Sequence, residues 1–111
     1  MPNDREIADA ILDRLAPLPV TLRSLFGLVG FYLSGQYFGF VNDGAIYFRT
    51  DEESKPAYVE RGMRTFQPKS RPRGPKTVDR NFTVPKDVVE DEELLKEWAI
   101  RAAQAARSRS G

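Results

Sequence analysis

The stretch "GFYLSGQYFGFVNDGAIYFRTD", residues 30–51, decides the fold because small and polar residues divide its aromatic run into short segments. The Ser-Gly pair at 34–35 and the Asn-Asp-Gly triplet at 42–44 are typical of hairpin turns. If 34–35 forms a two-residue turn, Tyr32 faces Tyr37 across the hairpin. Side chains along a strand alternate between two faces. The Phe and Tyr rings are therefore predicted to separate onto opposite faces of an antiparallel sheet.

The triplet at 42–44 sets the alignment of the next strand. We predict a three-residue type I turn with Gly44 in the left-handed conformation, because an odd number of turn residues keeps Ile46 and Phe48 on the face of the Phe rings. The predicted core face, under the helices, consists of Val29, Phe31, Leu33, Phe38, Phe40, Ile46 and Phe48. The predicted second face consists of Gly30, Tyr32, Tyr37, Gly39, Val41 and Tyr47. A ring with a hydroxyl group suits this second face because it can be half-hydrated.

On the N-terminal side, a helix precedes the strands. Asn3 and Glu6 have the spacing of a capping box, which predicts a helix that starts near Asp4. The prolines within 16–19 end it. A period of two from residue 20 to residue 50 then predicts four antiparallel strands in meander order.

On the C-terminal side, a short connecting helix is expected within 51–62, with Ala57 and Tyr58 pointing inward. A last short strand is expected at 80–85, and Asp91 is predicted to cap a final helix. The apolar stripe of that helix consists of Leu95, Trp98, Ala99, Ala102 and Ala106. The predicted order of elements is α-β(4)-α-β(2)-α.

Composition limits the function. The chain has 111 residues and a net charge of +1, which favours a single domain over 1–107, with a disordered tail at 108–111. Cys and His are both absent, so disulfides, thiolate or imidazole metal ligands and a histidine base are excluded. The N-terminus does not resemble a secretory signal, and the uncharged run at 25–41 is interrupted by glycines and Gln36. A cytoplasmic protein without a membrane partner is expected.

The acidic triplet at 51–53 is a candidate carboxylate site. Its position also suits a helix start, where acidic side chains interact favourably with the helix dipole. No complementary base or ligand cluster accompanies it. We therefore predict a protein that is not an enzyme, with no catalytic, cofactor-binding or metal-binding residues and no cofactor.

Three segments resemble a known family: "SLFGLVGFYLSGQYFGFV" (24–41), "IYFRTDEESKPAYVERGM" (46–63) and "VPKDVVEDEELLKEWAIRAAQAA" (84–106). From about Ile11 to Ala106, the chain resembles the N-terminal domain of the TfoX/Sxy family, the regulators of DNA transformation competence. The resemblance implies a two-layer α+β domain with helices on one side of an antiparallel sheet, similar to secretion-chaperone-like folds. It also implies a role in regulating competence genes.

The first functional hypothesis is a non-catalytic interaction module that binds another protein, or a second copy of itself as a homodimer. The interacting residues are predicted to be Tyr32, Tyr37, Tyr47 and Val41. A contiguous patch of rings on a surface is typical of an interface. The alternative is that another part of the same chain, such as the proline-rich loop at 66–78, covers these rings.

The second hypothesis is nucleic-acid binding, with bases stacked on the tyrosines and phosphates held by basic side chains. The predicted basic patch consists of Lys69, Arg71, Arg73 and Lys76, with Arg107 and Arg109 as further candidates. The near-zero net charge and the acidic cluster within 87–93 weaken long-range attraction to phosphate. A protein partner is therefore the favoured prediction.

Overall fold

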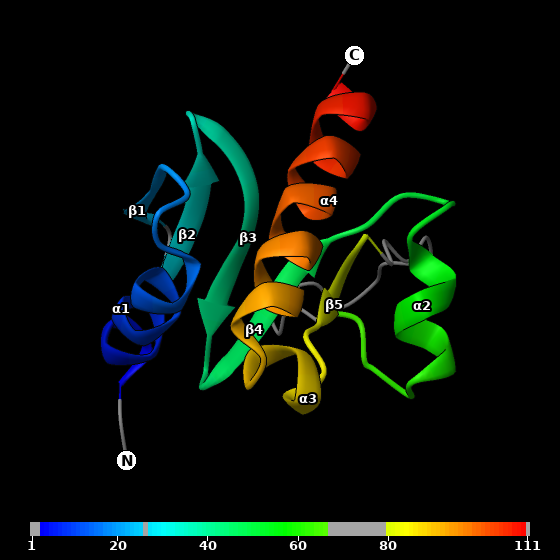
Figure 1. Cartoon of the computed structure of the whole chain (residues 1–111), viewed down its shortest axis with the longest axis horizontal. Coiled ribbons are helices and arrows are strands. Elements are labelled where there is room, and N and C mark those ends of the chain that lie inside the picture. The colour runs from blue at the N-terminus through cyan, green and yellow to red at the C-terminus, as the bar shows by residue number, and fades with distance from the viewer. Residues whose placement is uncertain (1–2, 26, 67–79, 111) are drawn as a thin grey trace.

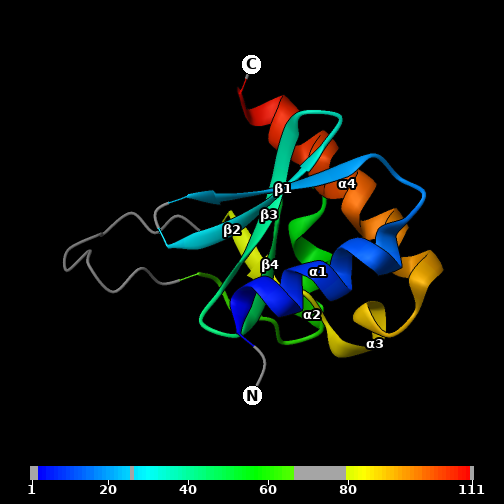
Figure 2. The ribbon, with the colours of Figure 1, turned by 90° about the vertical axis from the view of Figure 1, so that its left-hand side faces the viewer.

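The computed structural model describes residues 3–25, 27–66 and 80–110. It is a two-layer α+β domain, in which an antiparallel sheet carries helices on one face (Figure 1). Seen from the side, α1 (Asp4–Leu15) and α4 (Glu92–Ser110) lie on the same side of the strands (Figure 2). The predicted fold class is confirmed.

The strands follow one another in space in the same order as in the chain. They are β1 (Val20–Leu25), β2 (Leu28–Leu33), β3 (Gln36–Asn42), β4 (Ala45–Arg49) and β5 (Asn81–Thr83). All neighbouring pairs are antiparallel, which confirms the predicted meander. On the far side of β5, Thr65 forms a single bridge with Phe82. Of the two strands expected after the connecting helix, one is therefore β5, and the other is reduced to this bridge.

The two long helices begin at the predicted caps. Asn3 Oδ1 accepts the N–H of Glu6 at 2.8 Å, and Glu6 Oε1 accepts the N–H of Asn3 at 2.9 Å. At the start of α4, Asp91 Oδ1 accepts the N–H groups of Glu93 and Leu94 at 3.1 and 3.2 Å. These side chains satisfy backbone donors that have no partner within the helix.

The shorter helices depart in part from the prediction. The connecting helix α2 (Lys55–Glu60) buries Tyr58 as predicted but leaves Ala57 exposed. Consecutive helical residues point about 100° apart, so only one of this pair faces the sheet. A further short helix, α3 (Lys86–Val89), is not predicted from the sequence.

The long helix α4 extends beyond its predicted end, into the tail expected at 108–111.

A β-bulge in β3 changes the predicted division of the rings. Tyr32 pairs with Tyr37, whereas Phe31 pairs with Gly39, so Phe38 has no partner opposite it on β2. Phe31 and Phe38 therefore share one face, where their rings stack with centroids 5.7 Å apart. The extra residue reverses the alternation along the rest of β3.

Three assignments are therefore wrong. Phe40 lies on the second face instead of the core face, and its ring stacks on Tyr47 at 5.0 Å. Val41, predicted on the second face, is fully buried in the core. Gly39, also predicted there, pairs with Phe31 and Phe48 on the core side.

The second turn is also shorter than predicted. Asn42 pairs with Ala45, which leaves Asp43 and Gly44 as the turn, with φ of 51° and 82°. Two left-handed residues are typical of the type I′ turn, whose twist matches that of the strands. The one-residue difference in the turn offsets the one-residue bulge. Ile46 and Phe48 consequently remain on the predicted core face.

The core lies between this face and the helices. Its largest fully buried side chains include Phe31, Phe38, Phe48, Leu15, Leu95, Val41 and Val88. Leu33 and Ile46 pack against it and are partly buried. In the part of the chain that is described, no helix is both long and apolar enough to cross a membrane.

Candidate functional site

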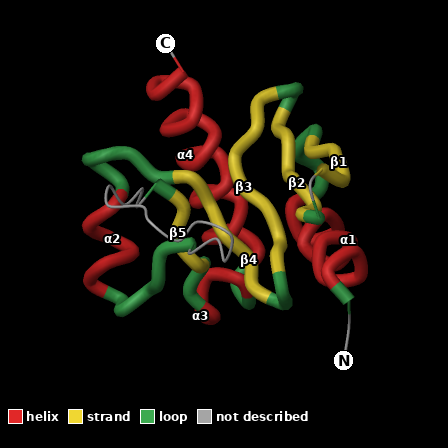
Figure 3. Tube along the Cα trace, turned by 180° about the vertical axis from the view of Figure 1, so that it is seen from behind, coloured by secondary structure: helices red, strands yellow, loops and turns green. Residues whose placement is uncertain are grey.

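The outer face of the sheet is its second face, opposite α1 and α4. Seen from behind, β2, β3 and β4 face the viewer, and none of the described helices lies over them (Figure 3). The strand register places these side chains on the outer face: Thr21, Arg23, Tyr32, Tyr37, Phe40, Tyr47 and Arg49. Three of the four predicted interaction residues lie here, and the fourth, Val41, is in the core.

Four of these side chains form a continuous row across four neighbouring strands, which we call the Arg–Tyr row. Arg23 on β1 places its guanidinium 5.6 Å from the centre of the Tyr32 ring on β2. Tyr32 and Tyr37 on β3 meet edge to face, with centroids 5.9 Å apart. Arg49 on β4 lies 5.9 Å from the centre of the Tyr37 ring. Such cation–π contacts hold a flexible guanidinium over a rigid ring.

Tyr37 is the more deeply placed of the two rings. Its hydroxyl group donates to Asn81 Oδ1 at 3.5 Å. Burial raises the pKa of Tyr37 to about 12, although the nearby Arg49 acts to lower it. The hydroxyl group therefore keeps its proton further into the alkaline range than an exposed tyrosine does, and its hydrogen bond to Asn81 anchors the inner part of the row.

A second aromatic cluster occupies the other half of the outer face. Phe66 packs edge-on against Phe40 at 4.9 Å and against Tyr47 at 5.3 Å. Phe40 is only 3% exposed, although it lies outside the core. The chain itself thus covers part of the predicted surface, and Tyr32 and Tyr37 are separated from Tyr47.

The predicted basic patch lies apart from the described site. Lys69, Arg71, Arg73 and Lys76 fall outside the described residues, as does the side chain of Arg109. Arg107 is exposed near the end of α4. The acidic cluster within 87–93 lies on α3, on the residues that follow it and at the start of α4.

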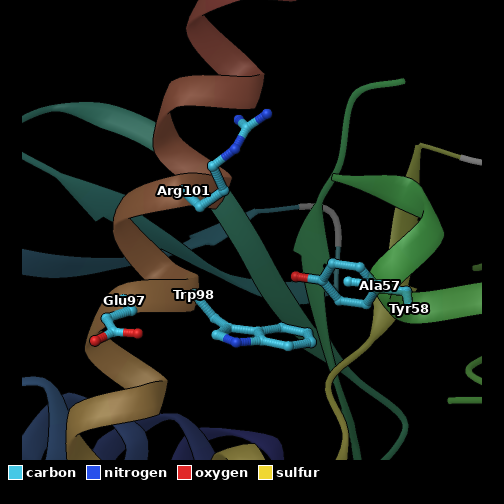
Figure 4. A pocket seen from close by; sticks show the side chains of 5 residues that line it. All are labelled: Ala57, Tyr58, Glu97, Trp98 and Arg101. Atoms are coloured by element: carbon cyan, nitrogen blue, oxygen red, sulfur yellow. The ribbon is translucent and has the colours of Figure 1, made fainter. Parts of the chain in front are cut away.

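The structure contains a further hollow that the sequence does not indicate, between α2 and α4. Its volume is about 260 Å³. It is lined by Ala57, Tyr58, Glu97, Trp98 and Arg101 (Figure 4). The Tyr58 and Trp98 rings lie 4.8 Å apart, although they are distant in the chain. The sequence indicates an inward Tyr58 and a buried stripe containing Trp98, but gives no signal that the two meet.

The arginine that lines this hollow is paired within the protein. Arg101 Nη2 donates to both carboxylate oxygens of Asp51, at 2.9 and 3.1 Å, and lies 3.6 Å from Glu53. Burial acts to raise the pKa of Asp51, but the Ser54 N–H and Arg101 together hold that pKa below its usual value. Asp51 also accepts the N–H of Ser54 at 2.9 Å. Asp51 thus orders the turn that leads into α2. The helix itself begins only at Lys55 and has no acidic residue in its first turn, so the triplet is not the helix start that the sequence suggests.

The model of the TfoX N-terminal domain family matches residues 11–106. No curated protein matches the chain in sequence. The match covers the sheet, the second half of α1 and nearly all of α4, and therefore includes every residue of the Arg–Tyr row. The chain belongs to the TfoX N-terminal domain family.

Proposed function

We propose that this protein is a non-catalytic, cytoplasmic binding module of the competence-regulator type, which acts through protein–protein contacts made by its outer face. Family membership supports a competence-related regulatory role. The observation that carries the proposal is the Arg–Tyr row on the outer face of the sheet, over which none of the described helices lies. Tyr and Arg are enriched at protein interfaces, because both combine a large contact area with a polar end.

Affinity capture from the native host tests this proposal. The baits are the wild-type chain, Tyr32→Ala, and Val59→Ala as a control on α2, where Val59 is 55% exposed. A protein enriched by the wild type should be retained by Val59→Ala and lost with Tyr32→Ala. Equal retention by both variants would place the contact elsewhere. Sedimentation of the purified wild type and Tyr32→Ala distinguishes a homodimer, which should dissociate only in the latter.

Nucleic-acid binding is the second candidate, and the distribution of acidic residues favours it. None of the five strands contains Asp or Glu, and their only charged residues are Arg23 and Arg49. The acidic cluster that opposes phosphate binding at the level of net charge lies on α3 and α4. Titration of a labelled single strand at low salt tests this candidate: binding should weaken steeply with added salt and be lost in Arg23→Ala. Binding insensitive to salt would rule it out.

A further inference from the structure

The exposed positive charge that the described strands place on the outer face comes from Arg23. Arg23 is exposed, and no carboxylate among the described residues pairs with it. By contrast, the arginines at 14, 61 and 101 on the helical side all have carboxylate partners. A partner that brings carboxylates would complete the electrostatics of the outer face.

The geometry of the row prepares Arg23 for such a partner. The Tyr32 ring faces the guanidinium and limits its freedom, while the N–H groups at the guanidinium edge stay available to an acceptor. Gly30, opposite Arg23 on β2, leaves space for this arrangement, because a Cβ at position 30 would lie 3.2 Å from the Tyr32 ring. Ordering the donor before binding lowers the entropy cost of association.

The same contacts disfavour nucleic-acid bases as the occupant. A base stacks on an open ring face. Tyr32 has Arg23 against its ring and meets Tyr37 edge to face, and Arg49 lies against the Tyr37 ring. A stacked base would have to displace these contacts, whereas a carboxylate binds the guanidinium edge and leaves them intact.

We propose that the outer face binds an extended acidic segment of a partner protein, in which a carboxylate pairs with Arg23 at the end of the Arg–Tyr row. This inference rests on the proposed function and specifies the chemistry of the partner. Arg23 is the main contact, and Arg49, which is half-buried and has further contacts inside the protein, adds positive charge at the far end.

Selection from a display library of random dodecapeptides on the full chain tests this inference. Enriched peptides should contain more acidic than basic residues. Binding of a selected peptide should weaken about tenfold in Arg23→Ala, as loss of a charge-assisted hydrogen bond implies. It should be unchanged in Arg5→Ala, which removes the same charge from the exposed N-terminal part of α1. Circular dichroism checks that both variants are folded.

The outcomes separate the inference from the proposed function. Neutral or basic peptides that lose binding in Tyr32→Ala would overturn the acidic partner and leave the protein-binding face standing. Peptides that bind Tyr32→Ala and Arg23→Ala as well as the wild type would overturn both. If oligothymidine displaces the selected peptides and binds more tightly in an Arg23-dependent manner, the acidic segment is overturned in favour of nucleic acid.

Discussion

Gly39 on β3 lies close against the backbone of β4. A Cβ at this position would collide with the carbonyl oxygen of Tyr47 and approach the Phe48 ring to 3.0 Å. A Cβ at Gly30 on the neighbouring strand would come closest to the Tyr32 ring, at 3.2 Å, and this side chain is able to shift. The two glycines, which lie in adjacent strands, therefore differ in how easily the fold can accommodate an added Cβ.

Gly39→Ala is therefore expected to destabilise the fold by about 2 kcal/mol, in the range of an overpacked core. The matched variant Gly30→Ala should cost clearly less and instead displace the Tyr32 ring. Urea denaturation of both variants and the wild type measures the difference. Equal losses for the two variants would show that the β3–β4 approach is not as close as described.

Tyr37 predicts how stability depends on alkaline pH. Its pKa is raised from 10.0 to about 12 by burial, so the folded state favours the protonated form. This contribution is fully present below pH 10 and is lost as the pH rises towards 12, by about 2 kcal/mol. Unfolding free energies measured across this window should fall less steeply in Tyr37→Phe. An unchanged slope would contradict the burial of this hydroxyl.

At the scale of elements, α1 is attached to the hairpin of β3 and β4 by a single carboxylate. Asp4 at the start of α1 accepts the N–H of Asp43 at 2.9 Å and that of Gly44 at 2.8 Å. The same helix is fixed at its other end by Leu15, which is fully buried. One side chain therefore connects a helix start to a two-residue turn nearly forty residues away.

Asp4→Ala should cost about 1 to 2 kcal/mol, because two backbone donors lose a charged acceptor. Asp9→Ala is the control on the same helix, since Asp9 makes only an exposed pair with Arg5 at 3.4 Å and should cost well under 1 kcal/mol. Thermal unfolding of the two variants compares them. A larger loss for Asp9→Ala than for Asp4→Ala would contradict the attachment.

The Asp51–Arg101 pair connects the approach to α2 with α4 and predicts the acid dependence. The pKa of Asp51 is lower in the folded state than its ordinary value of 3.8. The carboxylate therefore stabilises the fold above pH 3.8, and this stabilisation is lost as the pH falls through the pKa of the folded state. Asp51→Asn should reduce stability at neutral pH by about 2 kcal/mol and flatten this acid dependence. Acid titration of both proteins, followed by circular dichroism, measures it. Parallel curves would exclude Asp51 as a cause.

Local signals account for the elements that the sequence predicts correctly. The capping box at Asn3, the cap at Asp91 and the turn at 34–35 each depend on a few neighbouring residues. The bulge at Phe38 does not. It is needed because the turn at 43–44 has only two residues while Ile46 and Phe48 lie on the core face. Alternation along β3 alone therefore places Phe40 and Val41 on the wrong faces.

At the scale of the whole molecule, the five described strands carry no acidic residue, and their only charged residues are Arg23 and Arg49. The net charge of +1 hides this distribution, because it averages over the whole chain. The position of the Tyr rings on the outer face could be predicted from the sequence. The Arg–Tyr row could not, since its contacts depend on the register of four strands. The hollow between α2 and α4 likewise depends on tertiary packing.

We propose that the outer face of the sheet, and not the helical face, meets the partner. Photo-crosslinking in the native host distinguishes the two faces, with benzoylphenylalanine placed at Thr21, beside the Arg–Tyr row, or at Ile100 on α4, which is 38% exposed. We expect a covalent adduct with a protein from position 21 and none from position 100. An adduct from position 100 alone would show that the helical face makes the contact.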